Sequence, residues 1–258
     1  MSVIRTDLWL EQYYDQPIKI ADKLKSYFNN AIDSKEIHQH LVHHGMYRKK
    51  LRSDFVDQFK QMKCWDTIIQ EERRLKKLWN GPDVPIFIFP SDTLNRKIVK
   101  EYNGKSGLAF NDKLFLFLSL QNEKKEIQSL FIHEYNHVCR LTGAKREEKE
   151  YTLLDSIILE GMAENAVREQ IGGEFVASYI NYYEEMELNK MWEKLIQPNI
   201  TVTRNEKKHF DLLYGKGRYP NMAGYCVGYY IIKKVLEDKK LTTTDILNWS
   251  SNKIVKAL

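Results

Sequence analysis

The chain has 258 residues, of which 43% are hydrophobic, 12% aromatic and 29% charged, so it can bury a sizeable core and is not a disordered protein. Its net charge of +5 is the balance of 40 basic and 35 acidic residues, and both signs are interleaved in runs such as QEERRLKKL at 70–78. Interleaved runs are typical of solvated helix faces, so we expect no nucleic-acid binding.

The amino-terminal stretch MSVIRTDLWLEQYYDQP carries acids and tyrosines where a signal peptide needs a basic start and an apolar segment. The longest apolar run, LFLFL at 114–118, is too short to cross a bilayer. The three cysteines are scattered without CxxC spacing, which is typical of core thiols and not of disulfides: Cys64, Cys139 and Cys226. These features predict a cytoplasmic protein with no membrane span.

The first 80 residues are expected to be helical. In PIKIADKLKSYFNNAI the apolar residues recur at close to helical spacing, and a second helical pattern runs from 54 to a terminating Gly81-Pro82. We interpret 1–80 as a helical region that packs on the rest of the chain and does not fold independently. Whether it covers a substrate cleft is left open by the sequence.

The pattern then changes to that of a small sheet. VPIFIFP at 84–90 reads as a buried strand, and SGLAF at 106–110 and KLFLFLSL at 113–120 flank an Asn-Asp turn, so they can pair as a hairpin. Which of these two lies at the edge is left open. Helices are expected again over 124–142, 151–171, 174–196, 205–214, 222–237 and 243–249. The order of helices, sheet and helices predicts an α+β fold that is mostly helical.

The segment FIHEYNHVCR at 131–140 holds two histidines, His133 and His137, four residues apart, with Glu134 directly after the first. On a helix this spacing places both imidazoles on one face, where they can bind a single zinc ion at about 2.0–2.1 Å. Glu134, one residue further around the helix, can take a proton from the attacking water. The alternative is a helix with two packed histidines.

A third ligand is expected from the segment YTLLDSIILEGMAENAVREQIGG at 151–173. Glu160 and Glu164 share one helix face in an apolar stretch, where a carboxylate is costly to bury unless it is paired or binds a cation. Gly161 costs about 1 kcal/mol inside a helix and would allow this helix to approach the helix of the two histidines closely. The 22 residues between His137 and Glu160 are enough to end one helix near 143, turn through KREEKE at 145–150 and return.

With HEYNH followed by LEGMAE, the chain resembles the gluzincin metallopeptidases, and more narrowly the YjaZ-like group of predicted Zn-dependent proteases. The resemblance implies a zincin-like metallopeptidase domain over 81–258, with Glu160 as the third zinc ligand. It implies that Glu164 orients a zinc-bound histidine. The alternative for Glu164 is a salt bridge on the helix surface.

The resemblance extends to a Tyr-x-x-Gly segment in RYPNMAGYCVGYYII at 218–232. Tyr225, 65 positions after Glu160, matches the tyrosine that donates its hydroxyl to the oxyanion. Its alternative is core packing, and Tyr229 and His209 are second choices. The resemblance also implies that an edge strand before the HExxH helix aligns the substrate backbone in extended form.

A rival histidine cluster lies in HQHLVHHG at 38–45, where His40 and His44 are also four residues apart. No acidic partner stands at the right place, and no apolar strand precedes it. We interpret the cluster as a helix end whose histidines lie near the negative end of the helix dipole, with metal binding in vitro only incidental.

The sequence therefore predicts a zinc-dependent peptidase that binds one Zn²⁺ per chain and hydrolyses peptides or proteins. The preference for zinc over other divalent metals follows from the His, His and Glu ligand set. A zinc-stabilised binding or regulatory protein is the alternative function, and an inactive peptidase scaffold is a third. The sequence does not indicate the oligomeric state, or whether cleavage is internal or terminal.

Overall fold

The computed structural model describes residues 2–144 and 148–258. The chain forms two compact units, residues 1–138 and 139–258, and the division falls inside helix α7, Lys124–Ala144. The boundary predicted near residue 80 stays a prediction. Of the segment KREEKE, through which the chain was expected to turn, residues 145–147 lie outside the described residues.

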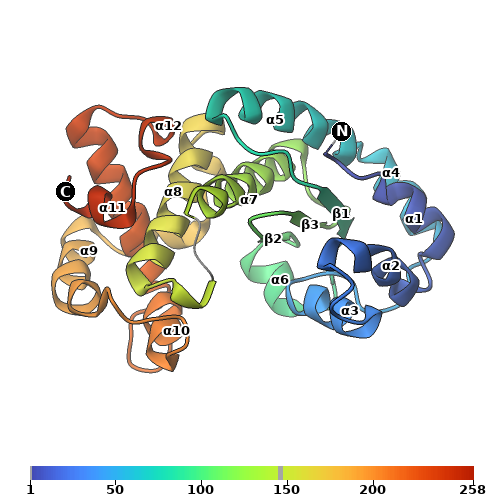
Figure 1. Ribbon diagram of the computed structural model, residues 1–258, viewed down its shortest axis with the longest axis horizontal. Helices are drawn as coiled ribbons and strands as arrows, with labels where there is room; N and C mark the ends of the chain where they lie inside the picture. The colour runs from blue at the N-terminus through green and yellow to red at the C-terminus, as the bar shows by residue number, and fades with distance from the viewer. Residues whose placement is uncertain (1, 145–147) are drawn as a thin grey trace. The chain divides into compact units, whose positions relative to one another are not determined.

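The first unit contains a three-stranded sheet, together with helices that come before and after the strands along the chain (Figure 1). Its elements, in chain order, are α1 Thr6–Tyr13, α2 Pro17–Leu24, η1 Lys25–Phe28, α3 Ser34–His43, α4 Ser53–Gln61, α5 Cys64–Trp79, β1 Ile86–Pro90, α6 Arg96–Glu101, β2 Ser106–Ala109, β3 Leu114–Leu118 and the start of α7. The expected helical character of the first 80 residues is confirmed.

The sheet has the strand order β1-β3-β2. Strands β1 and β3 are parallel, with Ile86 opposite Leu114, and β2 and β3 form the predicted antiparallel hairpin, with Ser106 opposite Phe117. Val3 forms a bridge to Ile86 on the outer side of β1. Strand β2 is therefore the edge that the sequence left undetermined.

The two faces of the sheet contact different helices. On one face the phenylalanines of β1 and β3 meet the N-terminal helices, with Tyr27 at 4.8 Å from Phe87 and Phe28 at 6.1 Å from Phe115 between ring centroids. On the opposite face, Gly107 of β2 lies against the Glu134 side chain of α7. Every residue of β1 and β3 is buried, so these two strands form the centre of the first unit's core.

The second unit is helical. Its elements after α7 are η2 Glu148–Glu150, α8 Leu153–Ile171, η3 Gly173–Phe175, η4 Ser178–Asn181, α9 Glu185–Met191, η5 Trp192–Ile196, η6 Gln197–Asn199, α10 Lys207–Tyr214, α11 Ala223–Lys239, α12 Thr243–Ile246 and α13 Ser251–Val255. With the small mixed sheet of the first unit, this gives the α+β, mostly helical fold that the sequence predicted.

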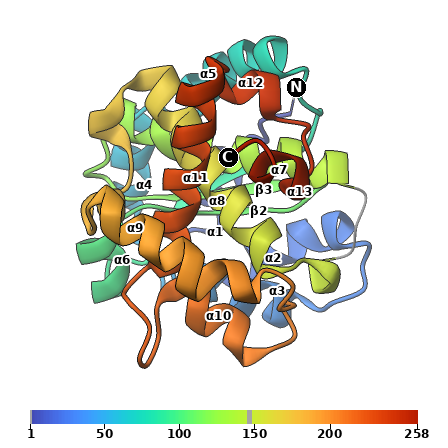
Figure 2. The same cartoon turned by 90° about the vertical axis from the view of Figure 1, so that its left-hand side faces the viewer.

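Helices α8 and α11 pack against each other at unusually short range (Figure 2). A β-carbon on Gly161 would lie 2.2 Å from the Gly228 carbonyl oxygen, and one on Gly228 would lie 2.0 Å from the Ile157 carbonyl oxygen. The amide of Asn165 donates to the carbonyls of Gly161 and Tyr229 at 2.8 and 3.1 Å, joining the helices. Gly161 thus allows α8 to pack closely on α11. The sequence analysis had expected this glycine to allow close packing on the helix that carries the two histidines.

Two predicted helices are shorter than expected. The stretch 174–196 begins as two short 3-10 turns, and α9 starts only where Glu184 and Glu187 form a capping box. In the stretch 243–249 the helix ends at Ile246. A new helix begins after Ser250, whose hydroxyl caps it. In both places a local cap stops or restarts a pattern that composition alone would continue.

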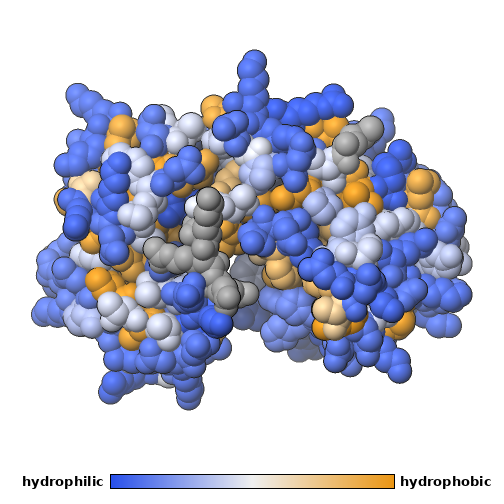
Figure 3. Space-filling model, in the orientation of Figure 1, coloured by the Kyte–Doolittle hydropathy of each residue, from blue (hydrophilic) through white to orange (hydrophobic). Residues whose placement is uncertain are grey.

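Hydrophilic side chains predominate on the face of the molecule shown in Figure 3. Within the described part of the chain, none of the helices combines the length and the apolar character that spanning a membrane requires.

Candidate metal centre

Helix α7 presents the HExxH residues from one of its faces. The rings of His133 and His137 lie 4.5 Å apart between centroids, at an interplanar angle of 82°. Glu134 and His137 are 8% and 7% exposed, and His133 is half-buried. A site at this depth is shielded from bulk water, so charges within it interact more strongly than at the surface.

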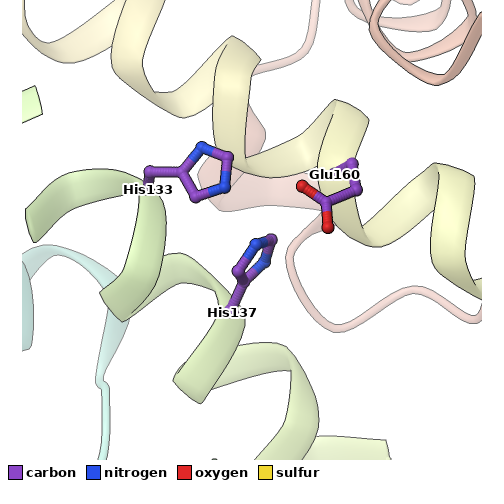
Figure 4. A group of neighbouring side chains, drawn as sticks. All are labelled: His133, His137 and Glu160. Carbon is purple, nitrogen blue, oxygen red and sulfur yellow. The ribbon is translucent and has the colours of Figure 1, made fainter. Parts of the chain in front are cut away.

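Figure 4 shows the two imidazoles and the carboxylate of Glu160, on α8, pointing toward one another. Their potential ligand atoms all lie within 4.8 Å of one another, and these residues form the one group of three or more His, Cys, Asp and Glu side chains in the described ranges that could hold a metal ion. Two imidazole nitrogens and one carboxylate suit a zinc ion with a position left for water. These are the three ligands that the sequence predicted; their binding of zinc stays a prediction.

The opposite side of α7 is fixed in the core of the first unit. Tyr135, fully buried, stacks on Phe131 at 5.4 Å and on Trp79 at 6.1 Å between ring centroids, and its hydroxyl donates to the Pro82 carbonyl at 2.9 Å. The contacts of Tyr135 therefore fix the orientation of α7 about its own axis. That orientation decides where the histidines and Glu134 point.

Glu134 lies directly against edge strand β2. A β-carbon on Gly107 would lie 2.3 Å from Glu134 Cγ and 2.4 Å from its Oε1. The Phe110 amide donates to the Lys113 carbonyl at 2.9 Å, and because hydrogen-bonded pairs alternate along an antiparallel ladder, Gly107 and Ala109 point their peptide groups to the outer edge. Among the described residues no further strand pairs with this edge of β2, which runs beside the predicted general base.

Glu164 is buried and held by a neighbouring segment of the second unit. It is 6% exposed, and it accepts a hydrogen bond from the Ala177 amide at 2.9 Å and another from the Tyr179 side chain. It is buried and not on the helix surface, and its role at the site stays a prediction. A carboxylate oriented in this way can in turn orient a neighbouring group.

Tyr225 belongs to a group of three tyrosines, which we call the tyrosine cluster: Tyr179, Tyr214 and Tyr225. The Tyr225 ring centroid lies 5.3 Å from that of Tyr179 and 5.5 Å from that of Tyr214. Burial, and then the negative charge of Glu160, raises the pKa of Tyr225 well above its ordinary value. Tyr225 is thus near Glu160 and keeps its proton at neutral pH, as a hydrogen-bond donor must.

His209 and Tyr229, the second choices for the oxyanion donor, make hydrogen bonds that connect helices. His209 is fully buried, with Nε2 3.1 Å from the Ser156 hydroxyl and Nδ1 3.2 Å from the Val202 carbonyl. Tyr229 is 8% exposed and its carbonyl accepts from the Asn165 amide. His209 therefore links α10 to α8, and Tyr229 takes part in the contact between α8 and α11.

The rival histidines lie at the end of α3 in the first unit, as expected. His40 and His43 are exposed and His44 is half-buried. Burial, and then the neighbouring charges of His40 and His43, lowers the pKa of His44 to about 4. No three of these side chains form a metal-holding group among the residues described.

Sequence reasoning did not find Gly107, Ala177 and Tyr179. Gly107 was part of a predicted strand, but its proximity to Glu134 depends on the pairing of β2 with β3. The Ala177 amide and Tyr179 contact Glu164 from a segment that was predicted to be helical. A break in the helical pattern after Gly172-Gly173 was the signal available for that segment.

Residues 64–256 match the protein family described as "Predicted Zn-dependent protease (DUF2268)". The chain is 39% identical over 267 residues to "Uncharacterized protein YjaZ" of Bacillus subtilis (strain 168), and the match covers 100% of both chains. No solved structure matches the chain.

Proposed function

The chain belongs to the family of predicted Zn-dependent proteases, and on this basis we propose that it is a zinc metallopeptidase of the gluzincin type with one zinc ion per chain. The observation that carries the proposal is that the potential ligand atoms of His133, His137 and Glu160 lie within 4.8 Å of one another. Zinc bound there would lower the pKa of a water molecule to about 7 and polarise the substrate carbonyl.

In the proposed reaction Glu134 acts as the general base. It removes a proton from the water that attacks the peptide carbonyl, and it then delivers that proton to the leaving nitrogen. The contact with Gly107 restricts its side chain to the region beside strand β2. Tyr225 donates its hydroxyl to the developing oxyanion, and its raised pKa supports this role because the donor stays protonated.

The substrate class follows from the edge of the sheet. Gly107 and Ala109 offer outward peptide groups to an extended chain, which can add to the sheet as a further strand. The absence of a side chain at Gly107 leaves room for Glu134 next to that added strand. Peptides or unfolded protein segments are therefore the proposed substrates.

The alternative is a zinc-stabilised binding or regulatory protein without activity. Structural zinc sites are usually closed by four protein ligands, whereas a catalytic site keeps one position for water. Within the described ranges the candidate group supplies three ligands, which supports the catalytic interpretation. The three cysteines are buried and form no disulfide, as expected of a protein in a reducing compartment. The cytoplasmic location itself stays a prediction.

The test begins with the metal content of the untagged protein and of Glu160→Gln. We expect about one zinc per chain in the wild type and its loss in the variant, because a neutral amide is a much weaker zinc ligand than a carboxylate. Unchanged zinc in Glu160→Gln would contradict the ligand assignment.

A peptide-library cleavage assay then compares wild type with Glu134→Gln. Glu134→Gln is expected to retain zinc and to lose turnover, because the amide cannot accept the proton. Cleavage by Glu134→Gln at the wild-type rate would contradict the general-base role. A zinc-loaded wild type that cleaves no peptide would favour the binding protein.

A further inference from the structure

His40 on helix α3 and His44, the residue that caps its carboxyl end, form a second pair of histidines whose ring separation is similar to that of the pair on α7. The ring centroids of His40 and His44 lie 4.8 Å apart at 58°, against 4.5 Å and 82° for His133 and His137. Two imidazoles one helical turn apart can bind a single late first-row divalent cation. Burial, and then the charges of His40 and His43, lowers the pKa of His44 to about 4, so its imidazole is unprotonated near neutral pH.

Hydrogen bonds fix the backbone of α3 at both of its ends. At its start Asp33 accepts hydrogen bonds from the Lys35 and Glu36 amides at 2.7 and 2.9 Å in a capping box. At its end the His44 amide donates to the His40 carbonyl at 3.2 Å, which fixes the backbone of the two histidines relative to each other. A fixed backbone reduces the conformational entropy that the two histidines lose when a cation binds.

The pair also lies beside the edge strand. The Ser106 hydroxyl at the start of β2 donates to the His44 carbonyl at 2.8 Å, and the His40 ring lies 6.1 Å from Phe110, just after the end of β2. Successive side chains of a strand point to opposite faces. Since Gly107 faces Glu134, Ser106 faces away from it, so α3 and α7 lie on opposite faces of the edge strand.

We propose that His40 and His44 form a second metal site, for zinc or a similar late first-row divalent cation, and that its occupation inhibits the peptidase. The site has two protein ligands and no carboxylate, so it fills after the three-ligand site. A substrate strand added to β2 projects alternate side chains toward α3, where the bound cation and its waters would obstruct them. The inhibitory part rests on the proposed function; the metal site does not.

The first test is a metal titration of protein already loaded with one zinc. Zinc or nickel is added to the wild type, and bound metal is measured by equilibrium dialysis and elemental analysis. We expect a second equivalent in the wild type and its loss in His40→Gln, with the first equivalent retained. His40 is exposed, so the substitution should preserve the fold, which a thermal melt verifies.

His43→Gln is the matched control, because His43 is an exposed neighbour on the same helix, with its ring centroid 5.4 Å from that of His44. It should keep the second equivalent. Loss in His43→Gln with retention in His40→Gln would overturn the assignment, as would a wild type that binds no second equivalent.

The second test measures peptide cleavage as zinc is raised above one equivalent. Inhibition of the wild type at concentrations that fill the second site, absent in His40→Gln, supports the regulatory role. Equal inhibition of both proteins overturns that role. If the wild type cleaves nothing at one equivalent, the proposed function fails, while the dialysis result still decides the metal site.

Discussion

Gly107 on the edge strand and Glu134 on the HExxH helix are in such close contact that no other residue fits at position 107 without displacing the glutamate. The added β-carbon would lie within 2.4 Å of Glu134 Cδ and Oε1, far inside van der Waals contact. The strand and the proposed general base are therefore positioned by each other. The contact lies within the first unit and joins the proposed substrate-binding edge to the proton-transfer group.

The first prediction concerns Gly107→Ala. The methyl group should push the Glu134 side chain out of position, because the glutamate is more easily moved than the backbone of a paired strand. We expect a loss of kcat of about 10²-fold, as a displacement of about 1 Å from reactive geometry can cause. Steady-state cleavage kinetics with a zinc determination measure this, and zinc content should stay at the wild-type level.

Gly143→Ala is the matched control for that substitution. Its added β-carbon would meet only Asn248 Oδ1 at 3.6 Å, an ordinary contact, so kcat should be unchanged. Normal turnover in Gly107→Ala would show that Glu134 does not need its position against β2.

The second prediction concerns the support of Glu164. Glu164→Ala removes a buried carboxylate held by the Ala177 amide and Tyr179. If Glu164 orients a zinc-bound histidine, zinc affinity should fall by about 10–100-fold. Competition with a chelator measures it.

Tyr179→Phe should weaken zinc binding less than Glu164→Ala, since the Ala177 hydrogen bond remains. Tyr182→Phe, at an exposed position nearby, is the control and should leave zinc affinity unchanged. Wild-type zinc affinity in Glu164→Ala would mean that the carboxylate serves only the folding of the second unit.

The third prediction concerns Tyr225→Phe. Loss of an oxyanion donor affects the transition state more than substrate binding, so kcat should fall about 10²–10³-fold with little change in KM. Zinc content should be unaffected. Tyr230→Phe, on the same helix, should keep wild-type kinetics, and a wild-type kcat in Tyr225→Phe would leave Tyr225 a packing residue of the tyrosine cluster.

The sequence predicted the parts of the site that depend on local spacing. His133, Glu134 and His137 lie within one and a half turns of a single helix, so their arrangement follows from helical geometry alone. The proximity of Gly107 to Glu134 depends on the pairing of β2 with β3. The hydrogen bond from the Ala177 amide to Glu164 comes from a loop 13 residues away in the sequence. Such contacts cannot be read from periodicity.

The same reason explains the error over 174–196. The composition of this stretch favours a helix, but the Ala177 amide donates to the Glu164 carboxylate, and Ala177 has an extended backbone. A tertiary hydrogen bond to a buried carboxylate therefore outweighs the helical propensity of the segment. The interruption supplies the backbone amide that the carboxylate needs.

The fourth prediction concerns the contact between α8 and α11, which determines where Glu160 and Tyr225 lie relative to each other. In Gly228→Ala the new β-carbon would meet the Ile157 carbonyl oxygen at 2.0 Å, and backbone atoms in two packed helices cannot move aside without separating the helices. We expect the free energy of unfolding to fall by about 1–3 kcal/mol, the usual cost of overpacking. Urea denaturation followed by circular dichroism measures it. Gly173→Ala is the matched control, because a β-carbon there would meet nothing within 4 Å, and its stability should not decrease. Equal stability of Gly228→Ala and wild type would show that the two helices can separate at no cost, and the distance from Tyr225 to Glu160 would then not depend on this contact.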